Sequence, residues 1–347
     1  MDRKTVFIIG AGASKEANLP TGLELKNKIV QLLNICFPDG YNQTSGDLTI
    51  TEVFRLLVKG EDGQMGDINS YIHEAWHIRD AMPQAISIDN FIDTHRENQK
   101  IALCGKLAVV QSILGAERKS LLYFDKYKNA STLNFNSLEK TWYSSFFQLL
   151  TENCAKSELK AHFQNITLII FNYDRCIEHF LLHALQNYYK INEAEAAEIV
   201  KHLNIYHPYG HVGNLPWMQA KDSMAFGELP NAQKLVILAN QIKTFAEGTD
   251  PDASEIAKIK EHMAKVSHLI FLGFAFHKLN MKLLIPTANL TGFNVVRCFA
   301  TAYLLSDSNK EAISEKIKGL YSSEVGIKMA DLQCNTFFNE NKNNLEF

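Results

Sequence analysis

The segment VFIIGAGAS at residues 6–14 constrains the fold most, because an apolar run of strand length passes directly into glycines. Gly10, Ala11 and Gly12 form the turn, and helical sequence follows Ser14. A buried strand that ends in a glycine turn and leads into a helix is typical of the first unit of a parallel α/β sheet. Such a turn either lets a pyrophosphate approach the backbone or is only a tight structural turn.

Other apolar segments of strand length support the same fold class. They are rich in Ile, Val, Leu or Phe, as buried parallel strands are. The predicted strands are residues 5–9, 167–171, 267–272 and 294–300, with 204–207 as an edge strand. The sequence therefore predicts an α/β fold, with a Rossmann-like parallel sheet, helices on both of its faces and a large helical insertion.

The insertion follows from the spacing of the first two strands. About 155 residues separate them, far more than one crossover helix needs. Helical patterns fill this interval, and two more helices are predicted within 231–266. No linker or repeat divides the chain, so we predict a single domain over residues 1–347 with a helical insertion at about 45–160.

Composition narrows the partners and the compartment. The chain is 46% apolar with a net charge of -3 and no basic tract, so nucleic acid is not indicated as a partner. Six dispersed cysteines without a CxxC pair predict neither a metal site nor a disulfide framework. The apolar runs are too short for a signal peptide or a membrane span, which predicts a cytoplasmic protein without membrane contact.

Polar residues and glycines follow the second and third long predicted strands, where ligands bind in open parallel sheets. Asn172 and Asp174 follow the second strand, and Gly273, Phe274 and Asn280 follow the third. Plainer interpretations exist beside the ligand-binding one. Asp174 and Asn280 are suited to cap helices, and Phe274 to pack in the core.

The loop HPYGHVG at residues 207–213 holds two histidines, His207 and His211. A histidine there is able to exchange a proton near neutral pH. The alternative is that each histidine only ties the loop to backbone carbonyls.

Six motifs in order, GAGAS, LPTG, SIDNFID, FNYD, HPYGHVG and LGFAFHKLN, resemble the zinc-free branch of the sirtuin-like superfamily found in bacterial anti-phage defence. The resemblance implies NAD+ as substrate and no metal. It implies that the glycine turn binds the pyrophosphate, that Asn172 holds the nicotinamide ribose and the attacking water, and that a loop histidine acts as base. The cofactor-binding residues predicted in this way are Gly10, Ala11, Gly12, Ser14, Thr21, Asp174, Gly273, Phe274 and Asn280.

The chain departs from the family at the loop, where Tyr209 precedes Gly210 in place of the usual His-Gly pair. We predict His207 as the base, since it directly follows a short strand, with His211 as the alternative.

The resemblance implies an NAD+ glycohydrolase that yields nicotinamide and ADP-ribose and depletes NAD during abortive infection. A non-catalytic subunit that senses NAD or ADP-ribose is the main alternative. A protein deacylase is disfavoured because the zinc-binding cysteine pairs of that class are missing. The resemblance also implies that the chain forms a homo-oligomer and works with a separate HerA-like ATPase or another defence partner.

Overall fold

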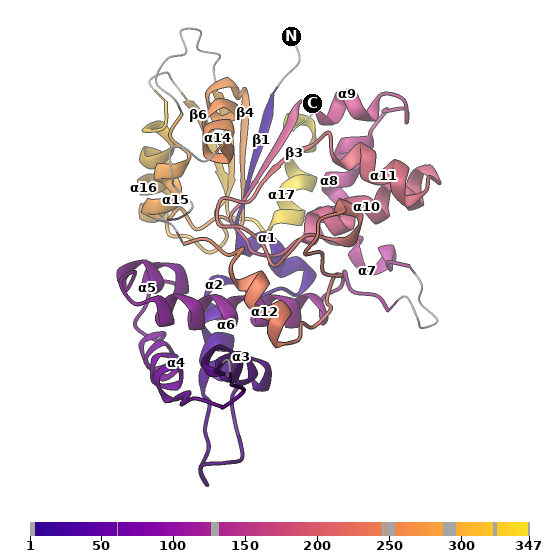
Figure 1. The fold of residues 1–347 in the computed structure, drawn as a ribbon. Coiled ribbons are helices and arrows are strands. Elements are labelled where there is room, and N and C mark those ends of the chain that lie inside the picture. Colours follow the sequence, from indigo (N-terminus) through magenta and orange to yellow (C-terminus); the bar gives the residue numbers. More distant parts are fainter. Residues whose placement is uncertain are drawn as a thin grey trace. The chain divides into compact units, whose positions relative to one another are not determined.

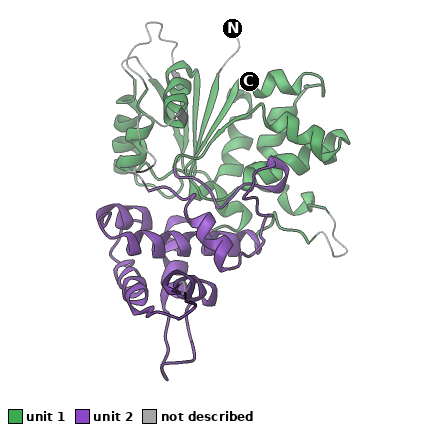
Figure 2. Ribbon diagram, in the orientation of Figure 1, with its two compact units in different colours: residues 1–19, 120–208, 249–347 green, residues 20–119, 209–248 purple. Residues whose placement is uncertain are grey.

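The computed structural model describes residues 4–60, 62–125, 132–244, 247, 254–286, 296–321 and 325–345. The chain forms two compact units, shown in Figure 2. Unit 1 comprises residues 1–19, 120–208 and 249–347, and unit 2 comprises residues 20–119 and 209–248. The helical insertion predicted at about 45–160 overlaps unit 2 only up to residue 119, and unit 2 also includes 20–44 and 209–248.

Unit 1 is built on a six-stranded sheet with the order β3-β2-β1-β4-β5-β6, and every neighbouring pair is parallel (Figure 1). This is the strand order of the Rossmann fold, which confirms the predicted α/β class. The strands are β1 (Thr5–Ile9), β2 (Ile166–Ile170), β3 (Asn204–Tyr206), β4 (His268–Leu272), β5 (Val296–Thr301) and β6 (Val325–Ala330).

Helices cover both faces of this sheet. On one face the Phe7 ring contacts Phe146 of α8 (Trp142–Thr151) at 5.1 Å and Phe338 of α17 (Cys334–Asn341) at 6.3 Å between ring centroids. Thr167 of β2 pairs with Val6, so its side chain points to the opposite face. There its hydroxyl lies 3.0 Å from Nδ1 of His262 in α14 (Ser254–Lys265). Both layers therefore bury apolar strands, which explains why the strands are continuous apolar runs.

A half-buried acid of the first 3-10 turn links two helices of unit 1. Glu16, in the 3-10 turn Lys15–Ala17, accepts the main-chain N–H of Trp142 at 2.7 Å and that of Asn335 at 2.9 Å. One carboxylate thus caps the first turns of both α8 and α17. The helices are α1 (Ala11–Ser14), α7 (Phe135–Leu138), α8 (Trp142–Thr151), α9 (Leu159–Phe163), α10 (Cys176–Tyr189), α11 (Glu193–Val200), α14 (Ser254–Lys265), α15 (Lys278–Leu283), α16 (Asp307–Lys318) and α17 (Cys334–Asn341), with a second 3-10 turn at Lys342–Asn344.

Unit 2 is helical. Its long helix α6 packs against α2, α4 and α12 and buries Leu107, Val110 and Leu114. Side-chain caps begin several of these helices, with Asp47 before α3 and Asn98 before α6. The helices are α2 (Gly22–Leu33), α3 (Leu48–Val58), α4 (Asn69–Ala81), α5 (Ile88–Thr94), α6 (Gln99–Glu117) and α12 (Ala232–Ala239), with a 3-10 turn at Pro216–Met218.

The predicted strands agree with the sheet to within one or two residues. The strand predicted at 294–300 starts in residues outside the described ranges, and its described part is β5. Strand β6 was not predicted, because its VGIKMA sequence lacks a continuous apolar run and it lies at the sheet edge. None of the helices in the described ranges has both the length and the apolar character needed to cross a bilayer.

Candidate functional site

The carboxyl ends of β1, β2 and β4 bring the predicted site residues of unit 1 together. The sheet order reverses between β1 and β4, so this pair marks the topological switch point at which open α/β sheets bind ligands. Gly10 directly follows β1, and Gly273 directly follows β4. Asn172 lies two residues beyond β2, on the other side of β1.

The glycines at the switch point let two backbone segments touch. The N–H of Gly12 donates to the carbonyl of Gly273 at 3.0 Å. A Cβ on Gly10 would lie 2.5 Å from that same oxygen, and a Cβ on Gly12 would lie 2.8 Å from it. Gly273 has a φ of 55°, and its own Cβ would lie 2.1 Å from the nitrogen of Ala13. The glycine pattern therefore has a packing reason that is independent of any ligand.

A buried polar cluster joins Ser14, Asn172 and Asp174. The Ser14 hydroxyl donates to Oδ2 of Asp174 at 2.8 Å and accepts from Nδ2 of Asn172 at 2.9 Å. Asp174 also accepts the first N–H of α10, from Cys176, at 3.1 Å through Oδ1. Burial raises the pKa of Asp174, while the Ser14 and Cys176 hydrogen bonds lower it. Asp174 thus accepts the first N–H of α10 from the residue before its N-cap, Arg175, and the Ser14 hydroxyl is bonded within the protein.

Asn172 is the exception in this cluster. Its Nδ2 donates to Ser14 and, at 3.1 Å, to the carbonyl of Gly10, so the side-chain amide is held in one orientation. Its Oδ1 is buried and accepts no hydrogen bond from any described residue. Buried acceptors without a partner are uncommon and call for an explanation, such as an absent ligand or water. Asn172 therefore offers a fixed acceptor at the carboxyl end of β2.

His207 follows β3 and is buried against acidic groups. Its Nε2 lies 2.7 Å from Oε1 of Glu178 in α10, and its Nδ1 lies 3.3 Å from the carbonyl of Asn172. Burial alone would lower the pKa of His207, but the charge and hydrogen bond of Glu178, the Asn172 carbonyl and the charge of Asp174 together raise it. These contacts favour the protonated ring over the neutral one, and only the neutral ring has the lone pair that a base needs. The structure places His207 beside Asn172, and its role as the base stays a prediction.

Sequence reasoning missed Glu178. It lies four residues after Asp174, in a buried and mostly apolar stretch of α10 that also holds His179. An acidic residue on the buried face of a predicted helix needs a partner, because an unpaired buried charge is costly. This was the sequence signal from which Glu178 could have been identified.

The remaining predicted site residues of unit 1 follow β4. Phe274 is buried in a cluster of rings, with centroids 5.1 Å from Phe171 and 5.1 Å from Phe276. These contacts agree with the plainer of the two interpretations, in which Phe274 packs in the core. Phe276 has a φ of 53°, a backbone conformation that bulky residues rarely adopt. Asn280 is the third residue of α15, and His277, not Asn280, occupies the N-cap position.

Two predicted site residues belong to unit 2. Thr21 is the N-cap of α2 and forms a capping box with Glu24. His211 lies in a turn in which Gly210 and Gly213 have φ of 71° and 97°. In the same turn, burial and the charges of Asp89 and Asp93 raise the pKa of Tyr209, so its phenol stays protonated near neutral pH. Tyr209, which stands where the sirtuin-like resemblance would place a histidine, is therefore a neutral hydrogen-bonding group.

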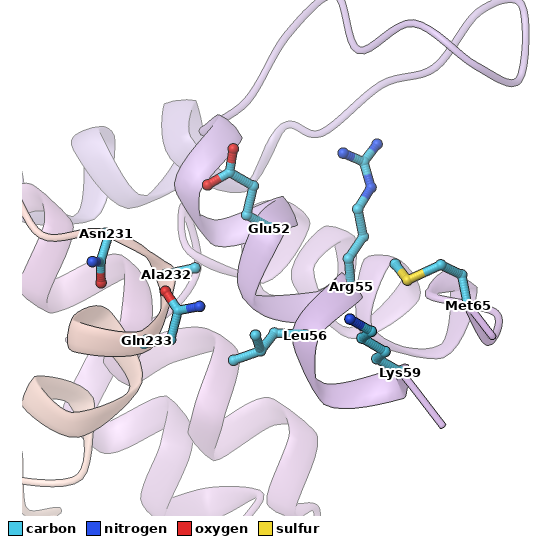
Figure 3. Close-up of a pocket in the computed structure, with 8 residues that line it drawn as sticks. All are labelled: Glu52, Arg55, Leu56, Lys59, Met65, Asn231, Ala232 and Gln233. Atoms are coloured by element: carbon cyan, nitrogen blue, oxygen red, sulfur yellow. The ribbon is translucent and has the colours of Figure 1, made fainter. Parts of the chain in front are cut away.

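Unit 2 also carries a shallow pocket of about 280 Å³. Figure 3 shows Glu52, Arg55, Leu56 and Lys59 along α3, with Met65 beside them. The residues of the α12 start, 231–233, complete the lining. No predicted site residue lines this pocket.

Within the described ranges, no group of three or more His, Cys, Asp or Glu side chains is arranged to hold a metal ion. No protein-family model matches the chain, and a search of curated proteins gives no match. The fold class and the geometry at the carboxyl ends of the strands are therefore the features of the chain that bear on its function.

Proposed function

We propose that the protein is an NAD+ glycohydrolase whose nicotinamide ribose binds beside Asn172. The observation that carries this proposal is the buried Oδ1 of Asn172, a fixed acceptor without a partner among the described residues. A ribose hydroxyl or an attacking water supplies the hydrogen that this oxygen lacks. The strand order supports a dinucleotide as the ligand, since Rossmann sheets bind dinucleotides at this switch point.

The proposed reaction is hydrolysis of the nicotinamide-ribose bond. The bond between the ring nitrogen and C1′ breaks, and its electron pair leaves with neutral nicotinamide. Water then forms a bond to C1′ and releases one proton, giving ADP-ribose. The transition state resembles an oxocarbenium ion, so orientation of the ribose and stabilisation of developing charge supply most of the catalysis. Asn172 fits this role because its amide cannot rotate without losing its bonds to Gly10 and Ser14.

A test compares Asn172→Ala with the matched control Asn341→Ala. Asn341 is also a buried asparagine of unit 1, but its amide donates to Phe337 within α17. Each variant is incubated with NAD+ and the products are separated by chromatography, after circular dichroism has shown that it is folded. We expect Asn172→Ala to lose about 10²-fold or more of the rate, as removal of a transition-state hydrogen bond does. Equal rates in both variants would exclude Asn172 from the reaction.

A non-catalytic subunit that senses NAD or ADP-ribose is the second candidate. Two observations favour it: the neutral phenol of Tyr209 stands at the family's histidine position, and His207 faces two acceptors. Calorimetric binding of NAD+ without any turnover, alone or with a partner, would favour this candidate.

We further propose that the protein is cytoplasmic, forms a homo-oligomer and acts with a HerA-like ATPase or another defence partner. Light scattering of the purified chain tests self-association. Repeating the NAD+ assay with such an ATPase tests whether the partner switches turnover on.

A further inference from the structure

We propose that Glu178 is a positioning residue that keeps His207 doubly protonated, and that the resulting cation fixes the backbone at Asn172. Its effect on catalysis rests on the proposed function, but its effect on the structure does not. Neither Glu178 nor a protonated His207 has a part in the reaction as derived above.

Two acceptors determine the protonation of His207. The Glu178 carboxylate lies 2.7 Å from Nε2, and the Asn172 carbonyl lies 3.3 Å from Nδ1. With Glu178 ionised, neither group has a hydrogen to donate. In that state both contacts are hydrogen bonds only if each ring nitrogen carries a proton. In a neutral ring, one lone pair would face an oxygen and lose that bond.

The charges around the pair support the cation. Glu178 and His207 are almost completely buried, with side chains 4% and 7% exposed. The charge of Asp174, which follows β2, also raises the pKa of His207. The carboxylate of Glu255 in α14 accepts the main-chain N–H of His207 at 3.0 Å. The ring therefore feels the charges of Glu178 and Asp174, while Glu255 holds the main chain of the same residue. A buried charge of one sign without its partner is costly, so the pair is maintained as a unit.

The pair connects segments that are remote in the sequence. Asn172 follows β2, His207 follows β3, and Glu178 lies in the first turn of α10. The ring of His207 thus joins the end of β3 to the segment that runs from the end of β2 into α10. Because it bonds the carbonyl of Asn172, it restrains the residue whose side chain offers the unpartnered acceptor. Loss of the cation should shift Asn172 without removing its amide.

The first test observes the ring directly and needs no activity. The protein is labelled with 15N-histidine, and NMR follows the His207 ring nitrogens and the Asn172 resonances through a pH titration. We expect both nitrogens to be protonated near neutral pH, and the Asn172 signals to change along the same curve as the ring. His179, whose Nε2 lies 3.1 Å from the Leu122 carbonyl, is an internal reference. A His207 ring with one unprotonated nitrogen near neutral pH would overturn the proposal.

The second test uses Glu178→Gln, which preserves size while removing the charge. Its control is Glu195→Gln, which removes the exposed partner of Lys156 in the same unit. We expect Glu178→Gln to lower kcat for NAD+ about 10²-fold with KM little changed, because small misplacements of orienting groups have effects of this size. Its kcat should also decline at lower pH than that of the wild type. A purely structural pair would change stability but leave kcat, its pH profile and the Asn172 signals unchanged.

The two tests separate this inference from the proposed function. If the wild type neither binds nor hydrolyses NAD+, the proposed function fails. The NMR signals of the ring nitrogens still show in that case whether His207 is a cation. If the wild type is active and Glu178→Gln has the same kcat and the same Asn172 signals, only the positioning role is refuted.

Discussion

Replacing Gly273 by alanine tests the packing of the β1 turn on the β4 loop. Alanine would have to adopt a φ of 55° and place its Cβ 2.1 Å from the nitrogen of Ala13 and 2.4 Å from the carbonyl carbon of Gly12. The left-handed conformation costs roughly 1–2 kcal/mol for a residue with a Cβ. Overpacking against backbone adds roughly 1–3 kcal/mol, because no flexible side chain is there to move away. The expected loss is therefore about 2–5 kcal/mol, a large part of the roughly 5–15 kcal/mol that stabilises a typical protein.

The assay is urea unfolding followed by circular dichroism, with Gly326→Ala as the control. Gly326 lies in β6 of the same sheet, and a Cβ there would have no neighbour within 4 Å. We expect a clear fall in the unfolding midpoint for Gly273→Ala, and a change within about 0.5 kcal/mol for the control. Equal midpoints would show that the two loops do not need the close approach seen in the structure.

Three further substitutions test single contacts. Ser14→Ala leaves buried polar atoms of Asn172 and Asp174 without their partner, so we expect a loss of about 1–3 kcal/mol in urea unfolding. Trp142→Phe removes the indole hydrogen bond to the main chain of α1 and some buried ring area, so the thermal midpoint should fall by several degrees, or about 1–2 kcal/mol. Thr21→Ala should cost about 1 kcal/mol while Thr21→Ser costs little, if the residue serves as the cap of α2; loss of NAD+ binding in both would instead favour a ligand contact.

Much of the sheet could be predicted from sequence, because buried parallel strands are continuous apolar runs that end in glycine or polar turns. The segments 5–9 and 267–272 have this pattern, and both are strands. Strand β6 lacks it, because an edge strand needs only partial burial. Its alternation of half-buried and exposed positions is too weak a signal over six residues.

The candidate site could be predicted only in outline. Topology places strand ends together, so Asn172 and the glycine turn were expected at one edge. The individual hydrogen bonds could not be predicted from the sequence, because they join residues far apart in the chain. Ser14 and Asp174, for example, are separated by 160 positions. The partner of His207 was missed for the same reason. Residue type alone does not distinguish a histidine that accepts protons from one held between two acceptors.

The pH dependence of stability provides a last test of the His207 and Glu178 pair. A histidine with a raised pKa in the folded state contributes stability that is complete below its unfolded pKa of about 6.5 and is lost as the pH rises through the folded pKa. Wild-type stability should therefore decline over this interval. His162 and His262 have lowered pKa values and act in the opposite direction, so the wild type alone gives a mixed signal.

The difference between the wild type and Glu178→Gln removes the contributions that the two proteins share. Unfolding free energies from urea titrations are measured for both from about pH 6 upwards, beginning below the unfolded pKa of histidine. The wild type should be more stable by the largest margin at the acidic end, and the margin should shrink as His207 loses its proton. Each pKa unit between the folded and unfolded states changes this margin by about 1.4 kcal/mol, so the curve also measures the shift. A constant margin across the whole interval would mean that His207 does not depend on Glu178 for its charge, and the proposed cation would have no structural basis.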